Sequence, residues 1–234
     1  MMLQDQPLLR RLILIGTPLL TGILLLFHPR PDAAVQMGGF DVFAFLSTVA
    51  DRFLAVHVLF APALALLGLS VILLLNGVRS IAARISRVSA FVFIVTYMMY
   101  ETIDGLVPPL LARGAAPLPP DEQAVIGDAI ERIIADPLLG DPSALFGLAW
   151  LSWIVAVTLA AFALRRSGQP LVPCILLGLS SIFVSHASLL GLIGLLLFLI
   201  AVVRIERAGS PVVMSEENEN RPSSYTRNWE KIED

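Results

Sequence analysis

The sequence is poor in the residues that build disulfides and cysteine metal sites. Cys174 is the one cysteine among 234 residues, and it lies in an apolar run. A disulfide within the chain is therefore excluded, and so is a zinc site built from several cysteines. Lysine is as scarce as cysteine, since Lys231 is the one lysine among the 16 basic residues.

Charged residues and catalytic motifs are also few. Charged residues make up 15% of the chain, the net charge is -3, and most arginines lie beside apolar runs. This pattern predicts no surface for nucleic acid. The patterns H-E-x-x-H, G-x-S-x-G, the phosphate-binding loop and the glycine-rich dinucleotide fingerprint do not occur. No motif therefore assigns a reaction, and whether the protein is an enzyme stays open.

Apolar residues dominate the rest of the chain. They make up 56% of it, and the mean hydropathy is +0.80, which is far more apolar than is typical of a soluble domain. The composition predicts an all-α integral membrane protein, a six-span transmembrane helical bundle with the lipid bilayer as its surroundings. The expected spans cover residues 10–28, 53–75, 85–106, 143–164, 170–185 and 188–204. This transmembrane domain ends near residue 208, and no separate catalytic domain is expected.

Two outer loops and a tail are predicted outside the spans. Residues 29–52 are expected to form the first loop and residues 107–142 the second. Within the second loop, residues 120–136 begin with prolines and acids and then place isoleucines on one face, which predicts an amphipathic extracytoplasmic helix. Residues 209–234 are polar, and we expect a disordered cytoplasmic tail.

The arginines predict the orientation of the chain. In the six-span arrangement most of them fall on one side, which should be the cytoplasmic side because cytoplasmic loops carry an excess of basic residues. Both termini are then cytoplasmic, the expected location is the plasma membrane, and the first span is expected to remain uncleaved. The arginines of the cytoplasmic side are Arg10, Arg11, Arg79, Arg84, Arg87, Arg165, Arg166, Arg204 and Arg207.

Five side chains that can bind a metal are predicted to gather at the outer face. His28, His57 and His186 fall near the outer ends of three spans, and Glu101 and Asp104 lie one helical turn apart at the end of a fourth. Imidazole and carboxylate ligands from separate helices suit zinc or another divalent ion. Such a pocket would fit a metal-dependent hydrolase of a lipid or a small polar substrate, with Glu101 or Asp104 as general base.

Other interpretations of the same residues remain open. His57 and Glu101 fit a buried pair that only sets helix register, and His28 fits an interfacial side chain. A haem between His57 and His186 is a further alternative. The remaining ones are a non-enzymatic assembly subunit with protein partners in the membrane, or a small transporter that uses Glu101. Transport would need a polar path, and the span that carries Glu101 offers mainly Thr96 and Ser89 for one.

Overall fold

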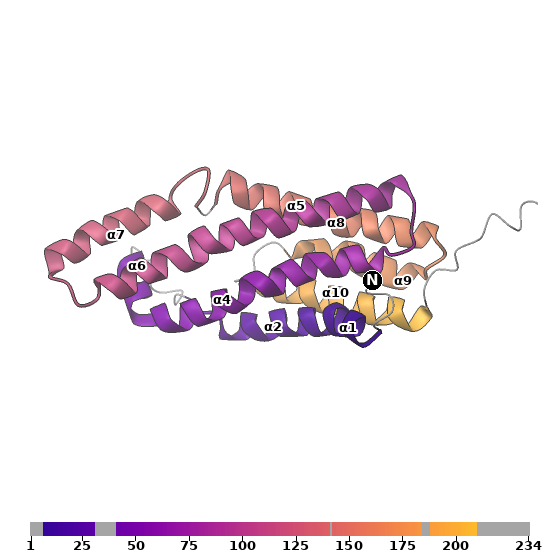
Figure 1. The fold of residues 1–234 in the computed structure, drawn as a ribbon, viewed down its shortest axis with the longest axis horizontal. Coiled ribbons are helices and arrows are strands. Elements are labelled where there is room, and N and C mark those ends of the chain that lie inside the picture. The colour runs from indigo at the N-terminus through magenta and orange to yellow at the C-terminus, as the bar shows by residue number, and fades with distance from the viewer. Residues whose placement is uncertain (1–6, 31–40, 141, 184–187, 210–234) are drawn as a thin grey trace, which may run out of the picture.

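A computed structural model describes residues 7–30, 41–140, 142–183 and 188–209, and every regular element in these ranges is a helix. Figure 1 shows the helices running side by side along one long axis. Five of them are long and apolar enough to cross a membrane: Leu8–Phe27, Val42–Leu74, Ile81–Ala115, Ala144–Arg166 and Leu189–Ala208. The all-helical prediction is confirmed, and the architecture fits a multi-pass membrane protein.

The fifth expected span, at residues 170–185, is shorter than the others in the structure. Helix α9 (Leu171–Leu179) and the following 3-10 turn η4 (Ser180–Ile182) form one short apolar stretch. At 1.5 Å per residue it measures about 18 Å, against a hydrocarbon core of about 30 Å. The count of six spans therefore stays a prediction. The expected turn around His186 and the expected tail beyond residue 209 lie outside the described residues.

The first apolar helix is interrupted by a π-helical segment. It consists of α1 (Pro7–Arg11), the π-helix η2 (Leu12–Gly16) and α2 (Thr17–Phe27). The hydroxyl of Ser70 in the next helix donates to the carbonyl of Ile13 within η2 at 3.2 Å. This bond fastens the first helix to its neighbour inside the bundle.

Helix α4 (Val42–Leu74) begins well before the predicted span at residue 53. Residues 42–52 were expected to belong to a loop, yet Asp41 accepts a hydrogen bond from the amide of Ala44 and caps the helix there. A side-chain cap of this kind satisfies one of the amides left open at a helix start. Leu46 and Ala50 are buried on one face of this early part, whereas Asp51 is exposed. The segment is therefore an amphipathic extension of the span.

The third apolar helix is also longer than its predicted span at residues 85–106. It runs through α5 (Ile81–Tyr100), the π-helix η3 (Glu101–Leu106) and α6 (Val107–Ala115). Helix α7 (Pro120–Ile134) follows within the region expected to contain an amphipathic helix. Leu46, Ala112 and Ile130 form a small apolar cluster that joins α4, α6 and α7. We call this end of the molecule the α7 end; it lies at the left of Figure 1.

The main core lies between α4, α5, α8 (Ala144–Arg166), α9 and α10 (Leu189–Ala208). Trp153 is fully buried at its centre, and its ring contacts those of Phe93 and Phe198. Its indole N–H donates to the carbonyl of Ser180 at 3.2 Å. A buried indole normally finds such an acceptor, and here the bond joins α8 to η4.

Arginine side chains close the opposite end of the bundle. The guanidinium of Arg10 pairs with Glu206 of α10 at 2.6 Å and donates to the carbonyl of Leu73 at 3.1 Å. Arg87 donates to the carbonyls of Leu75 and Val78. Cations near the last carbonyls of a helix satisfy those acceptors and interact favourably with its dipole. These contacts tie the end of α4 to the first and last described helices, and we call this end the arginine end.

Candidate functional site

His57 of α4 and Glu101 of η3 meet inside the bundle near the α7 end. The Nε2 atom of His57 lies 3.8 Å from Oε2 of Glu101, and the side chains are 2% and 1% exposed. Among the Asp, Glu, His, Lys and Arg side chains of the described residues, these two are the buried ones. Placing ionisable groups in an apolar interior costs free energy unless they compensate each other. The pair is therefore the strongest candidate for a functional site.

The orientation of the His57 ring is defined by its surroundings. Its Nδ1 lies 2.8 Å from the carbonyl of Phe53, one turn earlier on α4. A carbonyl only accepts, so Nδ1 carries the hydrogen and Nε2 is the nitrogen that gains or loses a proton. The Phe53 ring stacks on His57 with 4.1 Å between centroids and 5° between planes. The titrating nitrogen is thus directed at Glu101.

Local helix chemistry makes room for this pair. Pro108 and Pro109 have no N–H to offer to the carbonyls four residues earlier, and directly before them the amide of Val107 bonds to Thr102, five residues back. Such π-helical turns frequently occur at functional sites. Within this turn, a Cβ added to Gly105 would lie 2.3 Å from Cδ2 of His57 and 3.2 Å from Oε2 of Glu101. Only glycine allows η3 to approach the imidazole so closely.

His28 joins the site from a third helix. It follows the last residue of α2 and is half-buried, and its ring lies edge-on to that of His57 with 4.9 Å between centroids. The pKa of His28 is lowered to about 4, chiefly because burial disfavours the charged ring and also because Arg30 and Arg52 repel it, although a backbone hydrogen bond at Pro29 opposes this. His28 is therefore neutral at pH 7.

Asp104 lies beside the pair, near enough to Glu101 for the two carboxylates to repel each other. It is half-buried and accepts a hydrogen bond from the hydroxyl of Tyr100 at 3.3 Å. Tyr100 in turn packs edge-on against Tyr97 of the same helix. Asp104 and Tyr100 thus form the outer border of the site on η3 and α5.

The structure brings together three of the five predicted metal ligands. His28 and Glu101 both approach His57, Asp104 bonds to Tyr100, and His186 lies outside the described residues. In the part of the chain that the structure describes, no group of three His, Cys, Asp or Glu side chains is placed to hold a metal ion. Zinc binding, the hydrolase and the haem all remain predictions.

Sequence reasoning missed two residues that shape the site. Gly105 was not singled out, although a glycine inside a helical pattern and shortly before two prolines is a signal of unusual backbone. Phe53, which orients His57 through its carbonyl and its ring, has no sequence signal beyond its position one turn before the histidine.

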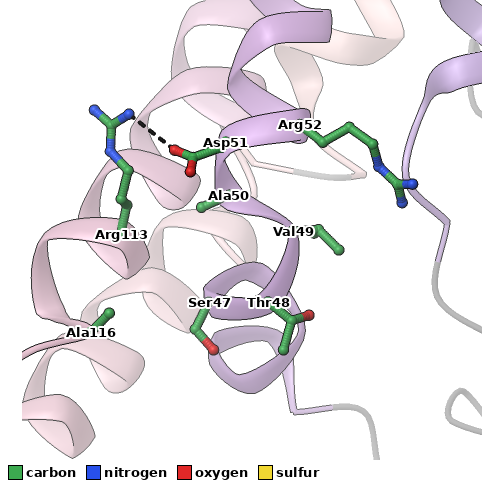
Figure 2. A pocket seen from close by; sticks show the side chains of 8 residues that line it. All are labelled: Ser47, Thr48, Val49, Ala50, Asp51, Arg52, Arg113 and Ala116. Carbon is green, nitrogen blue, oxygen red and sulfur yellow. Dashed lines mark hydrogen bonds and ion pairs between the residues drawn. The ribbon is translucent and has the colours of Figure 1, made fainter.

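A separate hollow of about 580 Å³ lies on the surface of the α7 end. It is lined by Ser47, Thr48, Val49, Ala50, Asp51, Arg52, Arg113 and Ala116. Figure 2 shows Arg113 directed at Asp51, which it meets at 3.3 Å, while Arg52 points away on the other side of α4. The two partners are 54% and 87% exposed, and an ion pair so open to water contributes little. These side chains do not converge on one point.

Comparison of the chain with protein-family models, with curated proteins and with solved structures finds no match.

Proposed function

We propose that this chain is a proton-coupled membrane transport protein and that the His57–Glu101 pair is its coupling site. The observation that supports it most is the burial of these two ionisable side chains, from two different helices, at 3.8 Å. Ionisable residues within membrane helices are rare and commonly mark proton relays and ion pathways. We therefore prefer a proton-coupling site over the metal pocket that the sequence predicted from the same residues.

The geometry suits the holding of a proton. A separation of 3.8 Å between Nε2 and Oε2 is longer than a normal hydrogen bond, so small movements of α4 or η3 change the contact strongly. The pair is favourable when both members are neutral or when both are charged, and costly when one alone is charged. Taking up or losing a proton therefore alters the attraction between the two helices.

The helices that carry the pair contain features that can bend. Glu101 begins the π-helical turn η3, and Pro62 lies in the interior of α4 shortly after His57. Helices bend at π-helical turns and at prolines because regular hydrogen bonds are missing there. A change in the charge of the pair can then be converted into movement of the helix segments beyond it.

Buried hydroxyls supply polar groups between the pair and the arginine end. Thr96, Ser86 and Ser70 are buried on α5 and α4, and each donates to a backbone carbonyl. Hydroxyls rotate, so each can exchange its backbone acceptor for a water or a solute group. These hydroxyls therefore give the proposed transport path polar groups within otherwise apolar helices.

Replacement of Glu101 by glutamine tests the proposal. In the wild-type protein in lipid, pH-difference infrared spectra should contain a carboxyl band whose amplitude changes with pH, because the pair titrates as a unit. Glu101→Gln should remove this band. In proteoliposomes with an internal pH dye, solute-driven proton movement should fall at least about tenfold in Glu101→Gln and in His57→Gln, as expected for the loss of a proton-transfer group.

Asp51→Asn is the matched control, because Asp51 is an exposed carboxylate on the same helix as His57. It should leave the carboxyl band and the proton movement unchanged. A wild-type spectrum in which the Glu101 band is absent or does not respond to pH would contradict the proposal.

A divalent metal site remains a second candidate because one observation favours it. The bond between Nδ1 of His57 and a backbone carbonyl is the orientation typical of a metal-bound histidine. Two donors that each lie about 2.1 Å from a tetrahedral zinc are about 3.4 Å apart, so the 3.8 Å between Nε2 and Oε2 would have to shorten slightly on binding. His28 is the nearest further imidazole among the described residues.

Metal analysis distinguishes this candidate from the first. A metal site predicts close to one zinc, manganese or iron ion per purified chain. His57→Ala should lower the metal affinity at least about tenfold, as is usual when a ligand or its orienting group is removed. Asp51→Asn should retain the metal. Purification without metal, together with an unfolding midpoint that added zinc and manganese leave unchanged, would refute it.

A further inference from the structure

His28 occupies the position between the buried pair and the surface of the bundle. The α-helix ends at Phe27, His28 has extended backbone, and the exposed Arg30 follows after Pro29. The His28 ring contacts His57 on one side and Phe53 on another, with 4.9 and 5.4 Å between centroids. It is half-buried, whereas His57 is 2% exposed.

We infer that His28 is a proton shuttle that carries protons between water at the α7 end and the His57–Glu101 pair. This inference rests on the proposed function, because a shuttle has a role only if the pair exchanges protons. It assigns to His28 a task different from that of His57, which holds the coupling proton together with Glu101.

The contacts around His57 favour this route. Phe53 covers one face of the His57 ring, its carbonyl faces Nδ1, and Gly105 lies against Cδ2. His28 approaches edge-on, close enough for transfer to Nε2 of His57 after a rotation of the ring or through one water. Both ring nitrogens of His28 are buried, so the ring must first turn one of them toward water. The step is then a proton transfer only: that nitrogen accepts a proton from water, and the other nitrogen releases one to Nε2.

The charges around His28 suit a shuttle rather than a storage site. Arg30, Arg52 and His57 face it, and burial together with the two arginines lowers its pKa to about 4. A proton on His28 is therefore short-lived at neutral pH and passes to the pair or back to water. At pH 7 one ring nitrogen of His28 carries no proton, so its lone pair can accept the next one.

The test is a pH-jump experiment on the protein in lipid, read by the infrared band of the Glu101 carboxyl. His28→Ala should slow the approach of this band to its new amplitude at least about tenfold, as expected for removal of a proton-transfer group. The pH midpoint of the band should stay within about half a unit of the wild type, because His28 changes the route of the proton and not its final site. Imidazole added to the buffer should restore the rate.

Two controls keep the result interpretable. Phe27→Ala removes the exposed neighbouring side chain and should leave both rate and midpoint unchanged. His28→Gln keeps much of the volume without a titrating ring, so it should be as slow as His28→Ala if the shuttle is the cause. Wild-type rates in both His28 variants would overturn the shuttle while leaving the proposed function intact. A wild-type band that does not respond to pH would instead overturn the proposed function itself.

Discussion

Gly105→Ala is expected to abolish proton binding by the His57–Glu101 pair and to lower the thermal unfolding midpoint. The added Cβ would lie 2.3 Å from Cδ2 of His57, a distance that real contacts do not show, so the imidazole or η3 must move. Forcing an extra methyl group into a packed interior costs about 1–3 kcal/mol. For a chain of this size that corresponds to a midpoint lower by about 2–12 °C. Circular dichroism in detergent measures the midpoint, and the Glu101 infrared band reports the pair.

Gly114→Ala is the matched control for this change. Gly114 also lies in the third apolar helix, but a Cβ added there meets nothing within 4 Å. Alanine is the better helix former by up to about 1 kcal/mol, so this variant should be as stable as the wild type or slightly more so. Gly105→Ala with an unchanged midpoint and a normal Glu101 band would show that the close approach of η3 to His57 is not required.

Gly194→Ala is expected to have the larger effect on stability, because the new Cβ would meet backbone. It would lie 2.6 Å from the amide nitrogen of Phe183 and 2.8 Å from its Cβ, where η4 ends against α10. Backbone cannot rotate away as a side chain can, so α10 and η4 must separate. We expect a cost of about 3 kcal/mol or more and a midpoint lower by at least about 6 °C.

The control for Gly194 is Gly178→Ala on α9. Its added Cβ would make an ordinary contact of 3.9 Å with Cβ of Ala161. This variant should unfold within about 2 °C of the wild type, since a substitution that makes only ordinary contacts changes the free energy of unfolding by about 0.5 kcal/mol or less. Equal midpoints for the two variants would mean that η4 and α10 do not pack as described.

The site combines three helices with different local structure, and this combination bears on the proposed function. His28 lies just beyond the end of α2, His57 lies within the long helix α4, and Glu101 begins the π-helical turn η3. Movement of α4 or η3 alters the contact between Nε2 and Oε2, and movement at the end of α2 alters the ring contact between His28 and His57. The Asp51–Arg113 pair joins the extensions of α4 and α6 at the α7 end, but its exposure makes it a weak constraint on that movement.

The sequence by itself determined the helical membrane architecture and the approximate places of the spans. Apolar runs of about 20 residues have few alternatives in a bilayer, because every backbone amide must be satisfied within its own helix. The start of α8 agrees with the predicted span at residues 143–164, and there Ser143 accepts a bond from the amide of Phe146. It also placed Glu101 and Asp104 one turn apart, in the part of the third helix where the structure forms the buried pair.

Tertiary structure alone decided where helices continue beyond the apolar runs and which side chains meet. Residues 42–52 and 107–115 are helical because Leu46, Ala112 and Ile130 bury one another across α4, α6 and α7, and no local pattern reveals that contact. The pairing of His57 with Glu101 depends on how far α4 and η3 approach, which the absence of a side chain at Gly105 permits. Sequence patterns report the chemistry of single helices, whereas a site between helices depends on their packing distance and rotation.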